Sequence, residues 1–179
     1  TQILAPNDVW GADYKGQFRT GDGRYCYPLT VTDGFSRYLL GCQALSSTAV
    51  AEAKPVFTRL FQEYGLPTRI RTDNGVPFAT TPLARLSKLS AWWVRLGILP
   101  EFIEPGRPDQ NGRHERMHRT LKAATTRPAA GSLAAQQRRF NTFRDEFNQE
   151  RPHEALDQQT PASCYATSTR EMPAQLPAL

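Results

Sequence analysis

The stretch YCYPLTVTDGFSRYLLGC, residues 25–42, determines how the first part of the chain folds. Residues Tyr25–Thr32 and Ser36–Cys42 are rich in aromatic and β-branched side chains, which favour strands, and they flank Asp33-Gly34. Glycine accepts the positive φ of a tight turn, so the pattern predicts a β-hairpin. A shorter apolar run, Val9–Tyr14, precedes it and predicts a third strand.

After the hairpin, the spacing of apolar residues changes from every second residue to the period of a helix. One helical stripe runs from Ala49 to Tyr64, with Thr48 as its expected N-cap and Gly65 at its end. Pro55 falls inside this stripe, so we expect it to kink the helix or delay its start. The remaining elements expected are a strand at Arg69–Thr72, a helix capped by Thr81-Pro82 and stopped by Gly97, a strand at Ile98–Ile103, a helix at Arg113–Thr125 and a helix from Leu133 to Phe147.

The order of these elements is three strands followed by alternating helices and strands. It predicts an α/β fold with a five-stranded mixed sheet flanked by helices, and it resembles the ribonuclease H-like architecture. We expect one domain over residues 1–150 and an extension over residues 151–179, whose last part, Ala166–Leu179, is loosely ordered. Trp92 and Trp93 lie on an apolar helix, which favours the core or a protein interface over base stacking.

The composition is that of a folded domain, with 39% hydrophobic and 22% charged residues. No apolar run reaches the roughly eighteen residues of a membrane span, and the N-terminus has no secretory signal pattern. The chain does not begin with Met, so we expect it to be part of a longer protein. Cys26, Cys42 and Cys164 match neither a disulfide framework nor a Cys-x-x-Cys metal site, which predicts free thiols in a reducing cytoplasm.

The net charge of +5 does not identify a partner by itself, but the distribution of the charge is informative. Phosphate backbones bind where positive charge is concentrated, and the C-terminal half holds such a concentration. Its members are Arg107, Arg113, Arg116, Arg119, Lys122, Arg127, Arg138, Arg139, Arg144 and Arg151. This distribution favours a nucleic-acid partner.

Three acids stand at positions suited to a shared site. Asp13 and Asp73 come near the ends of expected strands, and Glu115 lies in the first turns of an expected helix. Strand ends in a mixed sheet bring distant residues together, and clustered carboxylates stay ionised only when a cation compensates them. Oxygen ligands select Mg²⁺ or Mn²⁺, and two such ions can clamp a phosphodiester during displacement. Each acid alone is more often a loop cap than a catalyst, so the residues around them decide.

Those residues form four motifs: VWGAD at 9–13, TDNG at 72–75, PDQNGRHE at 108–115 and FNQERPHEAL at 147–156. Together they resemble the catalytic core of DDE transposases and retroviral integrases. The likeness is greatest to the integrase-like transposases of bacterial insertion sequences, and it extends over residues 6–166. Each motif is short, but their order and context are specific together.

The resemblance implies that Asp13, Asp73 and Glu115 are the catalytic acids and hold two Mg²⁺ or Mn²⁺ ions, with Asp13 bridging both. The implied activity is polynucleotidyl transfer: water cleaves a DNA strand, and a 3′-hydroxyl joins it to target DNA. The implied partners are DNA element ends and target DNA, with a homodimer or higher oligomer assembled on DNA and no membrane. The implied location is the bacterial cytoplasm, in association with the nucleoid.

The helix that carries Glu115 contains the candidate DNA contacts. Glu115, Arg119 and Lys122 are spaced to share one helical face, and the family has a basic residue two turns after the glutamate, which Lys122 matches. Arg113 and the entry loop Asn111-Gly112 complete the expected DNA-binding set. The alternative is a solvated helix with an ion pair between Glu115 and Arg119.

Two enzyme classes and a non-catalytic role remain as alternatives. His114-Glu115-Arg116-Met117-His118 fits the His-Glu-x-x-His signature of zinc peptidases. The positive charge inside that motif disfavours a metal, and we expect both histidines on the surface or facing DNA. A ribonuclease H-type nuclease would need a further acid on the first helix, where Glu52 lies. A DNA-binding or assembly module would keep binding after the three acids are neutralised.

Overall fold

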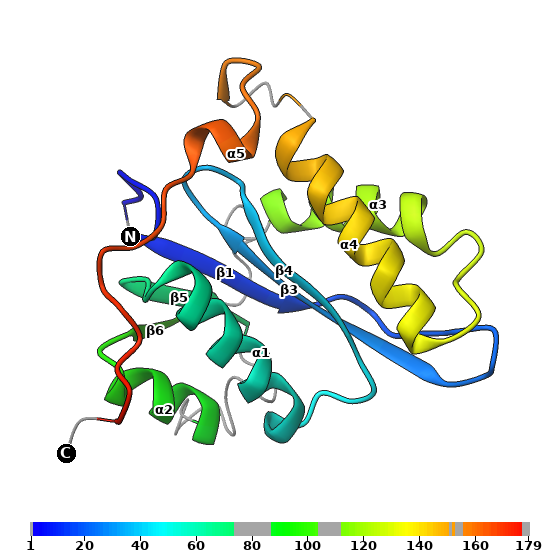
Figure 1. The fold of residues 1–179 in the computed structure, drawn as a ribbon, viewed down its shortest axis with the longest axis horizontal. Helices are drawn as coiled ribbons and strands as arrows, with labels where there is room; N and C mark the ends of the chain where they lie inside the picture. Colours follow the sequence, from blue (N-terminus) through cyan, green and yellow to red (C-terminus); the bar gives the residue numbers. More distant parts are fainter. Residues whose placement is uncertain (1, 74–86, 104–111, 151, 153–155, 177–179) are drawn as a thin grey trace.

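The computed structural model describes residues 2–73, 87–103, 112–150, 152 and 156–176, and it contains a mixed β-sheet packed with helices (Figure 1). Its elements are β1 (Val9–Tyr14), β2 (Phe18–Arg19), β3 (Tyr25–Asp33), β4 (Leu39–Leu45), α1 (Val50–Tyr64), β5 (Arg69–Thr72), α2 (Lys88–Arg95), β6 (Leu99–Phe102), α3 (Gly112–Thr125), α4 (Leu133–Gln149) and α5 (Pro161–Cys164). The strand order is β2-β3-β1-β5-β6, with β4 paired to β3. β1 runs antiparallel to β3 and parallel to β5.

The predicted α/β class with a mixed sheet is confirmed, but the expected count of five strands was wrong. The sheet has six strands, and the additional one is β2. It consists of Phe18 and Arg19, which pair with Cys26 and Tyr25 at the start of β3. Two residues are too few to show the alternation by which a strand is recognised, so the sequence pattern could not reveal it.

The expected hairpin between β3 and β4 forms, although its turn does not use the positive φ of Gly34. Arg37 has the positive φ, at 66°, and Asp33 accepts hydrogen bonds from Ser36 N at 2.9 Å and Ser36 Oγ at 2.6 Å. Gly34 serves close approach instead: its N–H donates to Val9 O at 2.8 Å, and a Cβ there would lie 3.0 Å from that oxygen. The turn therefore rests against the start of β1.

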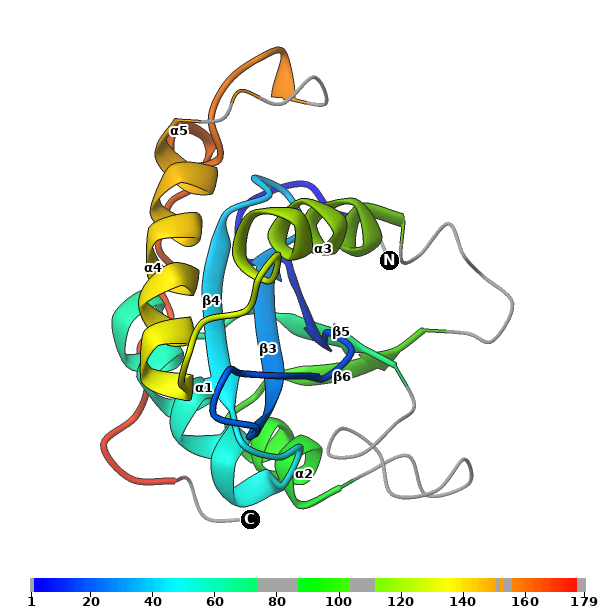
Figure 2. The same ribbon diagram turned by 90° about the vertical axis from the view of Figure 1, so that its right-hand side faces the viewer.

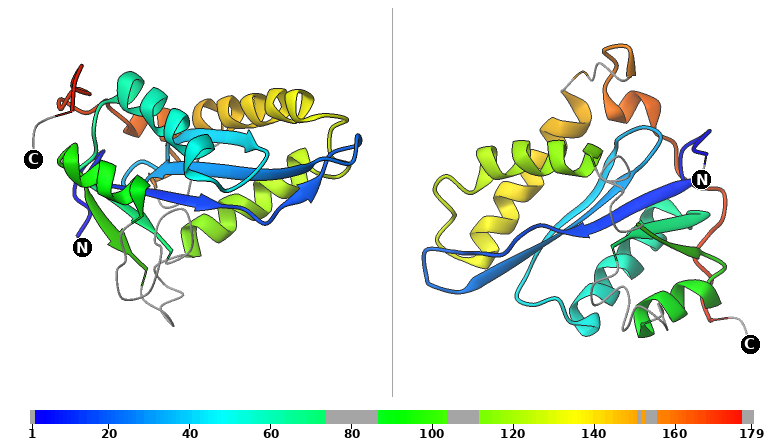
Figure 3. Two further views of the ribbon diagram at one scale, coloured as in Figure 1. Left: turned by 90° about the horizontal axis from the view of Figure 1, so that it is seen from below. Right: turned by 180° about the vertical axis from the view of Figure 1, so that it is seen from behind.

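The helices pack on both sides of the sheet, with α1 and α3 on opposite sides (Figures 2 and 3). α1 and α2 bury one core around Trp10 and Phe57, which includes Trp92 and Trp93 as expected. α3 and α4 bury a second core, whose members are Cys26, Leu39, Cys42, Met117, Leu121, Phe140, Phe143 and Phe147. In the part of the chain that the structure describes, no helix is long and apolar enough to cross a membrane.

α1 begins differently from the expectation. Its N-cap is Ala49, which makes no side-chain capping bond, so the predicted cap at Thr48 was wrong. The carboxylate of Glu52 instead accepts hydrogen bonds from the hydroxyls of Ser46-Ser47 and so fixes the turn before the helix. The helix then continues through Pro55, whose missing N–H removes a single helical hydrogen bond.

α2 and α4 each begin at a serine cap. Ser87 accepts from Ser90 N, and the Ser90 hydroxyl in turn accepts from Ser87 N at 2.7 Å. Ser132 accepts from Ala135 N at 3.1 Å. These side chains satisfy backbone N–H groups that have no partner within a helix. The expected cap at Thr81-Pro82 lies outside the described residues.

Residues 165–170, here called the strap, follow α5 and pack back on the domain. Ser168 N donates to Tyr64 O at 2.8 Å, at the end of α1. The guanidinium of Arg170 donates to Gly97 O at 2.8 Å, after the end of α2. The expectation that this part of the chain is loosely ordered was wrong for the strap, because backbone groups near the ends of two helices hold it.

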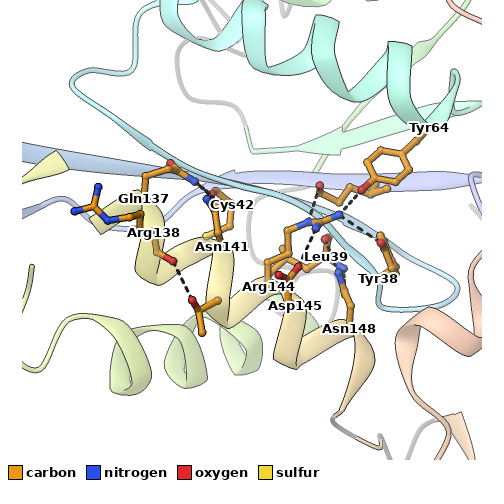
Figure 4. Close-up of polar contacts among 12 residues, drawn as sticks. Tyr38, Leu39, Cys42, Tyr64, Gln137, Arg138, Asn141, Arg144, Asp145 and Asn148 are labelled. Atoms are coloured by element: carbon orange, nitrogen blue, oxygen red, sulfur yellow. Dashed lines mark hydrogen bonds and ion pairs between the residues drawn. The ribbon is translucent and has the colours of Figure 1, made fainter. Parts of the chain in front are cut away.

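α4 runs along β4 and bonds to its backbone through two side-chain amides (Figure 4). The Asn148 amide accepts from Leu39 N at 2.7 Å and donates to Leu39 O at 2.9 Å. The Gln137 amide accepts from Ala44 N at 2.6 Å and donates to Cys42 O at 2.9 Å. The two amides pair with β4 as a neighbouring strand would, and they anchor α4, which in turn packs on α3.

Candidate active site

Asp13 lies near the end of β1, with its side chain 22% exposed. Burial and, after it, the negative charge of Asp73 raise the pKa of Asp13 to about 7, while the Tyr14 N–H and the Lys15 charge act in the opposite direction. A carboxylate with such a pKa carries negative charge that its surroundings do not fully compensate. Asp13 is therefore suited to receive a cation.

Asp73 follows β5 directly and reaches the same edge of the sheet as Asp13. β1 and β5 are parallel neighbours, and their register pairs Gly11 with Arg71. Each aspartate stands two residues beyond that pair, so the register brings the two acids side by side. The influence of the Asp73 charge on Asp13 agrees with this proximity. The side chain of Asp73 is exposed, so it faces the solvent side of the site.

Glu115 lies on α3 and is exposed. Among the described residues, no three His, Cys, Asp or Glu side chains come close enough to hold a metal ion together. The structure thus brings Asp13 and Asp73 together and leaves Glu115 outside their immediate contact. Mutual repulsion opposes the approach of a third carboxylate to two others.

His118 is a residue of α3 whose side chain points to the sheet, where it contacts Thr30 and Asp13. Its side chain is 10% exposed, its Nε2 is 2.8 Å from Thr30 Oγ1, and its Nδ1 is 3.8 Å from Asp13 Oδ2. The Thr30 hydroxyl also donates to Asp13 O at 3.3 Å. The expectation of a surface or DNA-facing His118 was therefore wrong. A signal existed: His118 is three residues before the buried Leu121 and shares its side of the helix.

These contacts bear on the two alternative enzymes. A zinc peptidase needs His118 as a ligand, yet its Nε2 bonds to Thr30 from inside the domain. The side chain of the other histidine, His114, lies outside the described residues. Glu52, the extra acid of a ribonuclease H, accepts from Ser46 N at 3.1 Å and Ser46 Oγ at 2.7 Å, so it stabilises the turn before α1.

Lys15 is a basic residue near the acids that sequence reasoning missed. Its Nζ donates to His118 O at 3.1 Å. Burial lowers the pKa of Lys15, and the positive charges of Lys122 and Arg127 lower it further, so these three cations lie near one another. The signal was its position: Lys15 stands two residues after Asp13, the spacing that puts side chains on one face of a strand.

The other residues expected to bind DNA are placed to different degrees. Arg119 is exposed on α3, and Lys122 lies one turn beyond His118. Gly112 begins α3. Asn111 and the side chain of Arg113 lie outside the described residues.

Two family models, both described as the integrase core domain, match this chain, one over residues 4–108 and the other over residues 96–161. The chain belongs to the integrase core domain family. This integrase core is 27% identical over 176 residues to an uncharacterized 31.7 kDa protein of insertion element IS407 from Burkholderia multivorans, an alignment that covers 95% of the chain and 60% of that protein. It is 30% identical over 118 residues to the Gag-Pol polyprotein of avian reticuloendotheliosis virus, covering 66% of the chain and 10% of the polyprotein.

Solved structures resemble the integrase core in fold. The catalytic core domain of HTLV-2 integrase, solved in complex with magnesium, superimposes with a TM-score of 0.69 at 18% identity, covering 92% of this chain and 99% of that one. A chain of the simian T-cell lymphotropic virus intasome, solved with a PP2A regulatory subunit, gives a TM-score of 0.73 at 19% identity, covering 100% and 60%. At identities this low the likeness establishes the fold alone. The superpositions confirm the ribonuclease H-like architecture.

Proposed function

We propose that this chain is the catalytic domain of an insertion-element transposase, a polynucleotidyl transferase that cleaves DNA strands and joins them to target DNA. The observation that carries the proposal is the pairing of Asp13 and Asp73 at neighbouring ends of the parallel strands β1 and β5. Membership of the integrase core domain family supports it, because the catalytic acids implied by the motifs include these two residues.

Asp13, Asp73 and Glu115 would hold two Mg²⁺ or Mn²⁺ ions. The donor set fits such ions: carboxylate oxygens are the ligands that hard divalent cations prefer, and the raised pKa of Asp13 marks negative charge that needs compensation. When bound, the ions supply charge neutralisation at the scissile phosphate and acidify the attacking hydroxyl or water. The chain's own part is to hold the carboxylates at fixed positions and to bring the DNA backbone across them.

The phosphate contacts would come from the basic residues beside the acids. Lys122 and Lys15 lie close enough to influence one another electrostatically, next to Asp13. Arg119 lies one turn after Glu115, and Arg113 with Asn111-Gly112 precedes it at the start of α3. A DNA backbone that crosses the acids would thus meet positive charge from the residue after β1 and from α3. The affinity for DNA would then fall steeply as the salt concentration rises.

The partners would be DNA element ends and target DNA, bound by a homodimer or higher oligomer in the bacterial cytoplasm, in association with the nucleoid. Residues 1–150 would form the catalytic core, and residues 151–179 an extension of it within a longer transposase. The bonds of the strap to the ends of α1 and α2 support an extension that packs on the core. The longer protein is supported by the insertion-element relative, of which the chain spans 60%.

A branched DNA that mimics the strand-transfer product tests the proposal, because its resolution needs the catalytic centre but little end recognition. The domain is assayed with Mg²⁺ or Mn²⁺, as wild type, Asp13→Asn, Glu115→Gln and the control Glu63→Gln, which alters an exposed acid on α1. We expect metal-dependent resolution by wild type and Glu63→Gln only. Full activity of Glu115→Gln, or inactivity of both the domain and the longer protein that contains it, would refute the assignment.

The same preparations distinguish the alternatives. Cleavage of RNA in hybrids that depends on Glu52 and exceeds DNA resolution would indicate a ribonuclease H-type enzyme. Peptide hydrolysis abolished by a zinc-selective chelator would indicate a peptidase. DNA binding without resolution, unchanged when all three acids are neutralised, would indicate a binding module.

A further inference from the structure

Three contacts join α3 to the sheet at His118. Its imidazole Nε2 meets the Thr30 hydroxyl on β3 at 2.8 Å, and its Nδ1 is 3.8 Å from the Asp13 carboxylate on β1. Its backbone oxygen accepts from Lys15 Nζ at 3.1 Å. The same Thr30 hydroxyl donates to Asp13 O at 3.3 Å, so one threonine contacts both His118 and the backbone of Asp13.

The position of His118 on α3 relates these contacts to Glu115. His118 is three positions after Glu115, and at 3.6 residues per turn their side chains leave the helix about 60° apart. The contact of His118 with the sheet therefore fixes how far α3 is shifted along its axis and how it is rotated about that axis, and so where Glu115 lies relative to Asp13. The buried apolar residues in the described part of α3, Met117 and Leu121, belong instead to the core that α3 shares with α4 and β4.

We propose that His118 is a positioning residue of the active centre: through Thr30 and Asp13 it holds α3 in the register that lets Glu115 and Asp13 bind the same pair of metal ions. The inference rests on the proposed function. A packing role alone does not account for it, because an apolar side chain would fill the same space without directing a polar ring at both the Asp13 carboxylate and the hydroxyl that supports its strand.

Four variants separate a positioning role from a structural one. His118→Gln can keep a donor near the place of Nε2 and so retain the bond to Thr30. His118→Ala removes the ring, and Thr30→Val removes the hydroxyl with little change of shape. Thr125→Val is the matched control, since it removes another buried hydroxyl of α3, bonded to Leu121 O at 2.7 Å and two turns away.

The first readout is Mn²⁺ binding to the DNA-free domain, followed by the electron paramagnetic resonance signal of the free ion. The second is the Mn²⁺ dependence of branched-DNA resolution, and thermal unfolding with EDTA reports the fold. We expect His118→Ala and Thr30→Val to weaken Mn²⁺ binding and shift the metal dependence by about 10-fold or more, as loss of a residue that orients ligands does elsewhere. His118→Gln should stay within about 3-fold of wild type, and Thr125→Val should bind normally whatever its stability.

Unchanged Mn²⁺ binding and activity in both His118→Ala and Thr30→Val would overturn the positioning role while leaving the proposed function intact. Equal loss in Thr125→Val would reduce His118 to a packing residue and likewise overturn it. If His118→Ala does not fold, Thr30→Val and His118→Gln decide the question. Wild-type binding that Asp13→Asn leaves unaltered would refute the metal site itself, and with it both proposals.

Discussion

The hydroxyl of Tyr165 donates a 2.7 Å hydrogen bond to the side-chain oxygen of Asn7, which ties the strap to the segment before β1. The same oxygen accepts from Trp10 Nε1 at 3.0 Å, and the Asn7 amide nitrogen donates to Ala166 O at 2.8 Å. Asn7 has a φ of 69°, a conformation that asparagine adopts more readily than most residues. One buried asparagine, in the segment before β1, therefore joins that segment to β1 and to the strap.

Asn7→Ala should lower the free energy of unfolding by about 3 kcal/mol, because it removes three hydrogen bonds and leaves the buried Trp10 N–H without its acceptor. Tyr165→Phe removes one of the three and should cost about 1 kcal/mol. Urea denaturation followed by tryptophan fluorescence measures both. Equal losses for the two variants would mean that Asn7 is not the junction.

Stability without divalent ions should fall as the pH rises, because the folded state raises the pKa of Asp13 from 3.8 to about 7. Protonated Asp13 favours the folded state. Its contribution is complete below about pH 4 and is lost as the pH rises through about 7. Asp13→Asn abolishes this dependence, so at pH 8 the variant should be more stable than wild type by about 2–4 kcal/mol, with little difference at pH 4.

Urea unfolding in EDTA at several pH values checks this prediction. Other acids, including the buried Asp33, titrate in both proteins, so the difference between wild type and Asp13→Asn isolates one group. A difference that does not vary with pH would show that Asp13 titrates normally in the folded domain.

Lys15→Gln should weaken binding to duplex DNA and reduce the salt dependence of that binding. If Lys15 contacts one phosphate, the slope of log K against log salt should become shallower by about 0.9. Fluorescence anisotropy at several salt concentrations measures the slope. Lys54→Gln, an exposed lysine on α1, should leave the slope unchanged, and a similar effect at both positions would argue for a diffuse charge effect.

Gly34→Ala should destabilise the domain by about 1–3 kcal/mol, because overpacking against backbone cannot be relieved by a rotamer change. The added Cβ would lie 3.0 Å from Val9 O and 2.9 Å from Ile3 Cδ1. Gly16→Ala is the control, since nothing lies within 4 Å of a Cβ at that position. Thermal unfolding of the two variants should separate them, and equal melting temperatures would contradict the close approach of the turn to β1.

The elements that sequence reasoning located correctly have periodic patterns of their own. β1 and β3 are runs of mainly apolar and β-branched residues, β5 alternates arginines with the buried Ile70 and Thr72, and the stripe of α1 is complete from Ala53 to Tyr64. The errors fall where a pattern is short or where tertiary contacts decide. β2 has two residues, and the cap of α1 was misassigned because Glu52, inside the helix, reaches back to serines before it.

The candidate site was predictable to the extent that sheet topology determines it. Parallel neighbours bring their ends together, which is why Asp13 and Asp73 could be paired from sequence. The burial of His118 had only one sequence signal, its spacing from Leu121, because α3 is polar over most of its length and the partner of the imidazole, Thr30, is 88 residues distant. Lys15 stands apart from the concentration of positive charge in the C-terminal half, so the charge pattern did not indicate it.

Fusion of the sheets of two copies of this chain is opposed at β4 and at β6. At β4, the amides of Asn148 and Gln137 occupy backbone groups that a second molecule's strand would need, so α4 would have to detach first. At β6, Leu99 N and Ile103 N donate toward the interior of the sheet, so position 100 turns its nitrogen outward. That residue is proline, which has no hydrogen to donate. Cross-β aggregation is thereby opposed at both places, and the oligomer proposed above would have to assemble through helices and loops.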